Sequence, residues 1–155
     1  MQKEQVIRIL EKYPEIDGEI AACRGFISEL EQWYDTSGAI TYDGMPKGKN
    51  SVSNPTERAA MNIPEFVRED IKIYSDKIAE LQRIKAAVLQ EVSRLRLKQK
   101  NVIFGFYFHR LRWEQVANCT HYSERQCKNI RDEAVERLAS GFGRSTALIL
   151  YAEKE

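Results

Sequence analysis

Apolar residues recur with helical spacing along two long stretches of the chain. The first follows Pro14 and steps by four and three residues through Ile16, Ile20, Cys23, Ile27, Leu30 and Tyr34. The second follows Pro64 with the same steps through Val67, Ile71, Tyr74, Ile78, Leu81, Lys85, Val88, Val92 and Leu95. This spacing marks one face of a helix, so the pattern predicts two long helices after a short helical start at Val6, Ile7 and Leu10.

The two stripes fit either an antiparallel helical hairpin or a dimerising coiled coil, and the pattern does not choose between them. Lys85 alone interrupts the second stripe; it either sets register or partner, or extends its ammonium group to water. Between the stripes, residues 35–63 collect Gly, Pro, Asn and Ser, which predicts a long loop. Its segment 44–50 lacks the G-x-x-x-x-G-K-S/T order that cradles a triphosphate, so we interpret it as a linker with incidental nucleic-acid contacts.

A third region, from about Asn101 to Gly141, predicts a helix-turn-helix. Its apolar start, residues 102–108, suits a strand by composition, but its context favours a helix. Trp113, Val116 and Ala117 mark a short helix over 112–119, and Ser123 is a favourable N-cap for a longer one. The inner face of that longer helix is formed by Cys127, Ile130, Ala134, Val135 and Leu138.

The outer face of the second helix carries polar and basic residues: Glu124, Arg125, Lys128, Asn129, Arg131 and Asp132. Arg125 and Asn129 lie one turn apart, where arginine can pair with guanine and asparagine with adenine, while Lys128 and Arg131 can neutralise phosphates. The alternative is an ordinary helical hairpin with solvated charges.

Charge is unevenly distributed, although the net charge is only +1. Residues 1–95 carry 13 Lys and Arg against 16 Asp and Glu, a balance of −3. Residues 96–144 carry 10 basic against 5 acidic side chains, a balance of +5. The positive field therefore belongs to the segment that contains the predicted helix-turn-helix, where a polyanion is attracted.

No catalytic, metal or cofactor site is predicted. Cys23, Cys119 and Cys127 form no CxxC pair, and His109 and His121 stand alone, so nothing suggests a disulfide framework, a zinc site or an enzyme. The sequence also lacks a signal-peptide stretch and a membrane-spanning run, from which we expect a cytoplasmic protein without a membrane partner.

The third region resembles region four of sigma-70 family factors. Residues 106–117, FYFHRLRWEQVA, look like the family's approach to its helix-turn-helix, and 122–138 match its "S-x-x-x-V-x-x-I-x-x-x-A-L-x-x-L" helix without a gap. The resemblance implies that Glu124, Arg125 and Asn129 approach bases and that Gln126 and Lys128 lie along the backbone. Two departures are His121, where the family often has glycine, and the order Glu124-Arg125. Histidine tolerates the left-handed conformation, but the DNA sequence that is read stays open.

The whole layout, with its "GMPKG…NPTERAA" loop, is similar to the ArpU/RinA-type late transcriptional regulators of phages and prophages. This resemblance implies activation of transcription at a phage promoter. The expected partners are double-stranded DNA, RNA polymerase and a second copy bound through the N-terminal helices. The alternative is a DNA-binding packaging adaptor of the small-terminase kind, although such proteins usually place the DNA module first.

The sequence thus predicts an all-α chain in three parts. Residues 1–98 form a coiled-coil-like region with the loop 35–63, residues 99–145 form the helix-turn-helix, and residues 146–155 form a tail. No cofactor is expected. The predicted DNA-binding residues are Arg112, Ser123, Glu124, Arg125, Gln126, Lys128, Asn129 and Arg131.

Overall fold

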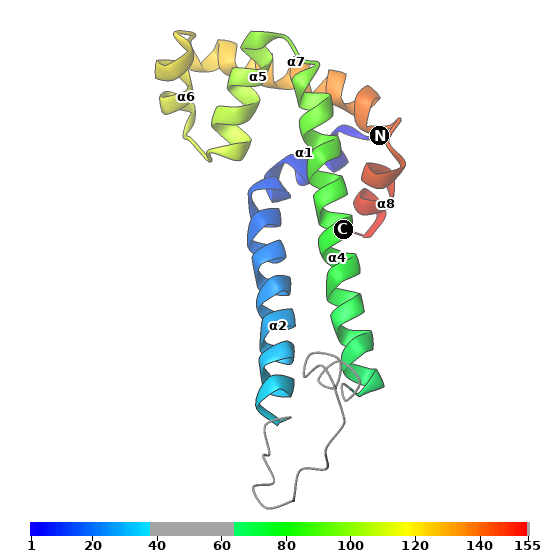
Figure 1. Ribbon diagram of the computed structural model, residues 1–155. Coiled ribbons are helices and arrows are strands. Elements are labelled where there is room, and N and C mark those ends of the chain that lie inside the picture. The colour runs from blue at the N-terminus through cyan, green and yellow to red at the C-terminus, as the bar shows by residue number, and fades with distance from the viewer. Residues whose placement is uncertain (38–63, 155) are drawn as a thin grey trace, which may run out of the picture. The chain divides into compact units, whose positions relative to one another are not determined.

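The computed structural model describes residues 1–37 and 64–154, and the predicted all-α class is confirmed for them. Their elements are α1 (Lys3–Lys12), the 3-10 turn η1 (Tyr13–Glu15), α2 (Ile16–Ser37), α4 (Glu65–Ser93), α5 (Leu97–Ile103), the π-helical turn η2 (Phe104–Phe108), α6 (Trp113–Thr120), α7 (Glu124–Phe142) and α8 (Thr146–Lys154) (Figure 1). The helix expected to end near Tyr34 continues to Ser37. The remainder of the predicted loop, including 44–50, lies outside the described residues.

The chain divides into two compact units. Met1–Glu19 and Ala79–Glu155 form one, here called the terminal unit, and Ile20–Ile78 form the other, the hairpin unit. This division differs from the expected boundary after residue 98, because the first helix and the end of α4 pack with the C-terminal helices. Residues 146–154, expected as a tail, form α8, which buries Leu148, Tyr151 and Ala152.

The described part of the hairpin unit consists of two helical segments that run in opposite directions (Figure 1). The ring of Phe26 in α2 stacks on that of Tyr74 in α4, with 5.2 Å between centroids. Ile20, Cys23 and Val67 are buried. The sequence left open an antiparallel hairpin or a dimerising coiled coil, and within one chain these helices form the hairpin. Dimerisation through them stays a prediction.

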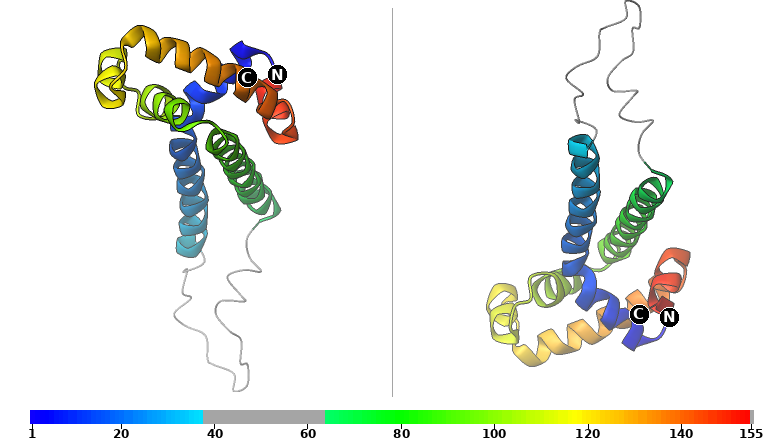
Figure 2. Two further views of the ribbon diagram at one scale, coloured as in Figure 1. Left: turned by 90° about the horizontal axis from the view of Figure 1, so that it is seen from above. Right: turned by 90° about the horizontal axis from the view of Figure 1, so that it is seen from below.

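In the terminal unit, α1 packs against α7, and α7 runs from the turn after α6 to α8 (Figure 2). Val6, Ile9 and Leu10 of α1 are at most 2% exposed. At the surface of the same contact, the Lys3 ammonium donates to Glu136 Oε1 at 2.5 Å. The N-terminal helix is therefore part of the core on which the predicted helix-turn-helix is built.

Lys85 lies at the edge of that core. Its Nζ donates to both carboxylate oxygens of Asp17, at 2.5 and 2.6 Å, and stands 5.9 Å from the centre of the Tyr13 ring. The side chain is 30% exposed, so the aliphatic stem is covered while the ammonium group reaches a carboxylate at the surface. Of the two roles that the sequence left open, the structure places Lys85 with its charge extended to the surface.

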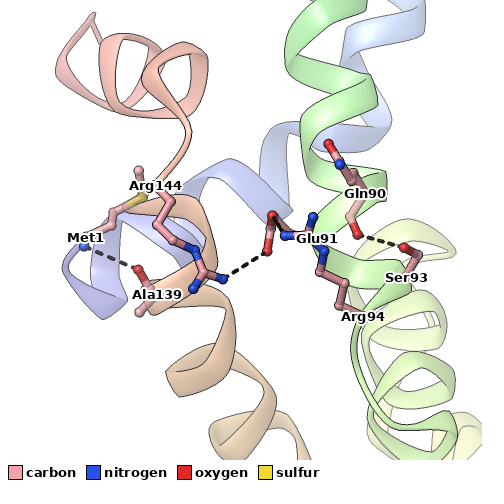
Figure 3. Close-up of polar contacts among 7 residues, drawn as sticks. All are labelled: Met1, Gln90, Glu91, Ser93, Arg94, Ala139 and Arg144. Carbon is pink, nitrogen blue, oxygen red and sulfur yellow. Dashed lines mark hydrogen bonds and ion pairs between the residues drawn. The ribbon is translucent and has the colours of Figure 1, made fainter.

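A polar cluster joins the end of α4 to the end of α7 (Figure 3). Glu91 Oε1 accepts from Arg94 at 2.5 Å, and Glu91 Oε2 lies 3.9 Å from the Arg144 guanidinium. The Met1 amino group donates to the carbonyl oxygen of Ala139 at 3.3 Å. The Glu91 side chain is only 12% exposed, because it lies over Gly141, where a β-carbon would come within 2.2 Å of Oε2.

Candidate nucleic-acid interface

The turn between α6 and α7 is set by Thr120 and His121. His121 ends α6 in the left-handed conformation, with φ 60° and ψ 24°. Thr120 closes the last turn of α6 by donating from its hydroxyl to the carbonyl oxygen of Val116 at 2.7 Å. His121 therefore adopts the left-handed conformation that histidine was expected to tolerate here, and the tight turn predicted at this position is present.

Ser123 begins α7 through a reciprocal cap. The Gln126 amide N–H donates to Ser123 Oγ at 3.2 Å, and the Ser123 amide N–H donates to Gln126 Oε1 at 3.0 Å. Each bond satisfies a backbone donor that the helix itself leaves free. The N-cap prediction for Ser123 is confirmed, and the carbonyl side of Gln126 is occupied within the protein.

One half of this cap begins three other helices, whose capping residues make no side-chain cap hydrogen bond of their own. The glutamine at the third helical position accepts the N–H of the capping residue in α1, α5 and α6, as Gln5, Gln99 and Gln115. For α6 the capping residue is the exposed Arg112, whose amide lies 2.9 Å from Gln115 Oε1. These caps were not predicted from the sequence, although a glutamine three residues after the capping residue is a recognisable signal.

A small apolar cluster fixes the angle between α6 and α7. It consists of Val102, Val116, Cys127 and Ile130, all at most 7% exposed, flanked by Phe106, Leu111, Trp113 and Ala117. The predicted inner face of α7 is confirmed, since all five of its residues are buried. The opposite face of α7 is thereby turned to solvent.

That solvent face presents Glu124, Arg125, Lys128 and Asn129, which are all exposed. In the described part of the chain, none of these four side chains makes a hydrogen bond or an ion pair. Arg125 and Asn129 are one helical turn apart on the same face. Four side chains with open hydrogen-bonding groups therefore occupy the first two turns of α7.

Arg131 departs from the expected outward position. Its side chain is only 25% exposed, its Nε lies 2.7 Å from Asp132 Oδ1, and its guanidinium carbon stands 5.5 Å from the centre of the Trp113 ring. Beneath it lies the phenol of Tyr107, whose pKa is raised by burial and partly lowered again by this guanidinium. Aromatic and acidic neighbours thus hold Arg131 against the module, and its predicted phosphate contact has less freedom than that of Lys128.

The segment before α6 supplies further positive charge. Arg110 adopts a left-handed backbone, with φ 52°, and its guanidinium lies 2.7 Å from Glu15 Oε1. Arg112 is exposed and has no ion-pair partner among the described residues. Farther along α7 the charge reverses at Asp132, Glu133 and Glu136. Exposed positive charge without an ion-pair partner in the described part of the chain is therefore present at the start of α6 and in the first turns of α7, as it also is at Arg96 and Arg137.

Comparison of the chain with protein-family models, with curated proteins and with solved structures found no match. Within residues 1–37 and 64–154, no three His, Cys, Asp or Glu side chains lie close enough to share a metal ion. None of the described helices combines the length and apolar character that crossing a bilayer requires.

Proposed function

We propose that the chain is a sequence-specific, double-stranded-DNA-binding transcriptional regulator of phage or prophage genes, of the ArpU/RinA type. The observation that supports it most is the capped, solvent-facing start of α7, where Arg125, Lys128 and Asn129 have no hydrogen-bond or ion-pair partner among the described residues. In an ordinary helical hairpin such groups are simply solvated. A helix that enters the major groove uses them directly.

Each group has a proposed role in the complex with DNA. Arg125 and Asn129 occupy the line of α7 that is farthest from the core, so they approach base edges, as Glu124 does at the first position. Lys128 and Arg112 approach backbone phosphates. The cap made by Ser123 and Gln126 holds the first turn of α7 rigid, and the free amide group of Gln126 faces the backbone.

The test is binding of the full chain to duplex DNA selected from a random pool. Arg125→Ala is expected to cost about 1–3 kcal/mol on the selected duplex and to relax its sequence preference. Lys128→Gln is expected to weaken all duplexes alike and to lower the slope of log affinity against log salt by about 1. Lys72→Gln, in the hairpin unit, is the matched control and should change neither.

An unchanged affinity and preference in Arg125→Ala would show that α7 does not read bases. Equal losses from Lys128→Gln and Lys72→Gln would show that the lysine effect is one of net charge. The first result would overturn the proposed recognition face, and the second would overturn the phosphate contact proposed for Lys128.

The proposal includes the setting in which such a protein acts. We place it in the cytoplasm of a bacterial host, as a sigma-like activator without covalent chemistry, in contact with RNA polymerase and associated with a second copy through its N-terminal helices. Footprinting on a late promoter with and without polymerase tests that contact. The alternative function is an oligomeric packaging adaptor, which light scattering would reveal as a closed ring of many subunits instead of a monomer or dimer.

A further inference from the structure

Trp113, the first residue of α6, contacts side chains of both η2 and α7. Its ring stacks on that of Phe106 in η2, with 4.0 Å between centroids and 17° between planes. Two cations of α7 stand over the same indole: Lys128 Nζ at 5.9 Å and the Arg131 guanidinium carbon at 5.5 Å from its centroid. Because Phe106 fills one face of the indole, the two cations face the other.

The two cations differ in what else holds them. Arg131 is mostly covered and paired with Asp132, whereas Lys128 is exposed and has no ion pair in the described part of the chain. An aromatic face attracts an ammonium group without cancelling its charge, as a carboxylate would. Lys128 therefore keeps its full positive charge while its long side chain is drawn toward α6.

We propose that Trp113 is a positioning residue that holds the Lys128 ammonium group ready for a phosphate of the DNA backbone. The inference rests on the proposed function and adds the device that prepares one of its contacts. A free lysine side chain loses rotamer freedom when it binds, and a side chain already held over a ring loses less. The pull toward α6 also separates Lys128 from the Arg125–Asn129 line, which leaves that line to the bases.

A purely structural role for Trp113 makes a different prediction. The indole would then support α6 through Phe106 alone, and its loss would weaken DNA binding equally whether or not Lys128 is present. The two roles are therefore separated by a double-mutant cycle.

The experiment measures duplex affinity of the full chain over a series of salt concentrations for Trp113→Leu, Lys128→Gln and the double variant. Trp113→Leu is expected to weaken binding about two- to fivefold, the size of an exposed cation–π contact. In the Lys128→Gln background the same change should have almost no effect. Trp113→Tyr should retain more of the affinity than Trp113→Phe, since tyrosine holds a cation better.

Circular dichroism at the assay temperature checks that each variant is folded. If Trp113→Leu is not folded, the comparison of Trp113→Tyr with Trp113→Phe tests the proposal instead. Additive losses in the cycle would overturn the positioning role while leaving DNA binding intact. Wild-type protein that binds no duplex at any salt would overturn the proposed function and this inference with it. Without DNA, we expect the Lys128 ε-methylene protons to be shifted upfield in the NMR spectrum, and we expect this shift to be lost in Trp113→Leu. Absence of the shift in the wild type would overturn the positioning role but not the proposed function.

Discussion

His121 is the residue on which the α6–α7 turn depends most directly. Its φ of 60° is a conformation that glycine adopts freely and that β-branched residues resist. We expect His121→Gly to leave the free energy of unfolding unchanged or to raise it by up to about 1 kcal/mol, and His121→Val to lower it by about 1–2 kcal/mol. Thermal denaturation followed by circular dichroism measures both.

The matched control is His109→Val, because His109 is also exposed but has φ −95° in the right-handed region. A smaller loss of stability is expected there. If valine costs the same at both positions, backbone strain at His121 is not what the substitution probes.

At the scale of elements, the Glu91 carboxylate of α4 pairs with Arg94 and with Arg144, which follows the end of α7. Glu91→Gln removes the partner of Arg94 and Arg144 while keeping the shape of the side chain. Because both guanidinium groups are exposed and screened by solvent, we expect a loss of only about 0.5–1 kcal/mol in the free energy of unfolding. Urea denaturation in low and in molar salt should show the loss shrinking as salt increases.

Glu80→Gln is the corresponding control on the same helix. Glu80 pairs with Lys154, and both side chains are about half exposed or more. The expected change is below about 0.5 kcal/mol. A larger effect at Glu80 than at Glu91 would contradict the role given to burial of the Glu91 carboxylate against Gly141.

The elements around α7 also show what sequence can predict. Apolar spacing predicted the buried residues of α7, and serine followed by glutamine at the third position is a local capping signal, so neither needed tertiary information. The sequence prediction placed Arg131 on the outer face, and that was wrong. Arg131 lies one helical turn from both Cys127 and Val135, so its backbone position borders the buried face, and the Trp113 ring of α6 covers its guanidinium further. Local patterns determine faces and caps, while the direction of a long side chain depends on neighbours that folding supplies.

At the scale of the molecule, the terminal unit needs its first helix. Leu10 is completely buried against the C-terminal helices, and we expect Leu10→Ala to lower the free energy of unfolding by about 2–5 kcal/mol. Duplex binding should be lost at the temperature where this unit unfolds, although α1 carries none of the predicted DNA contacts. Paired melting and binding curves of the full chain measure both effects.

Leu97→Ala makes the same chemical change at a position that is 73% exposed, so its expected effect is within about 0.5 kcal/mol. Unchanged stability in Leu10→Ala would mean that the proposed DNA-binding module folds without α1. This dependence could not be predicted from sequence, because the pattern of α1 shows an apolar face without showing which distant helix covers it.

The contact of α1 with α7 also has a consequence for how the chain is synthesised. Lys3 leaves the ribosome 133 positions before Glu136, so the first helix has no partner during most of translation. The hairpin unit, Ile20–Ile78, emerges between Lys3 and Glu136 and can fold first. Its folding removes roughly half of the chain that forms the loop between α1 and α7. Halving a loop lowers its closure free energy by only about 0.6 kcal/mol, which is a factor of about three in the equilibrium constant for closing it. We therefore expect the segment without predicted DNA contacts, once folded, to favour completion of the unit that carries them.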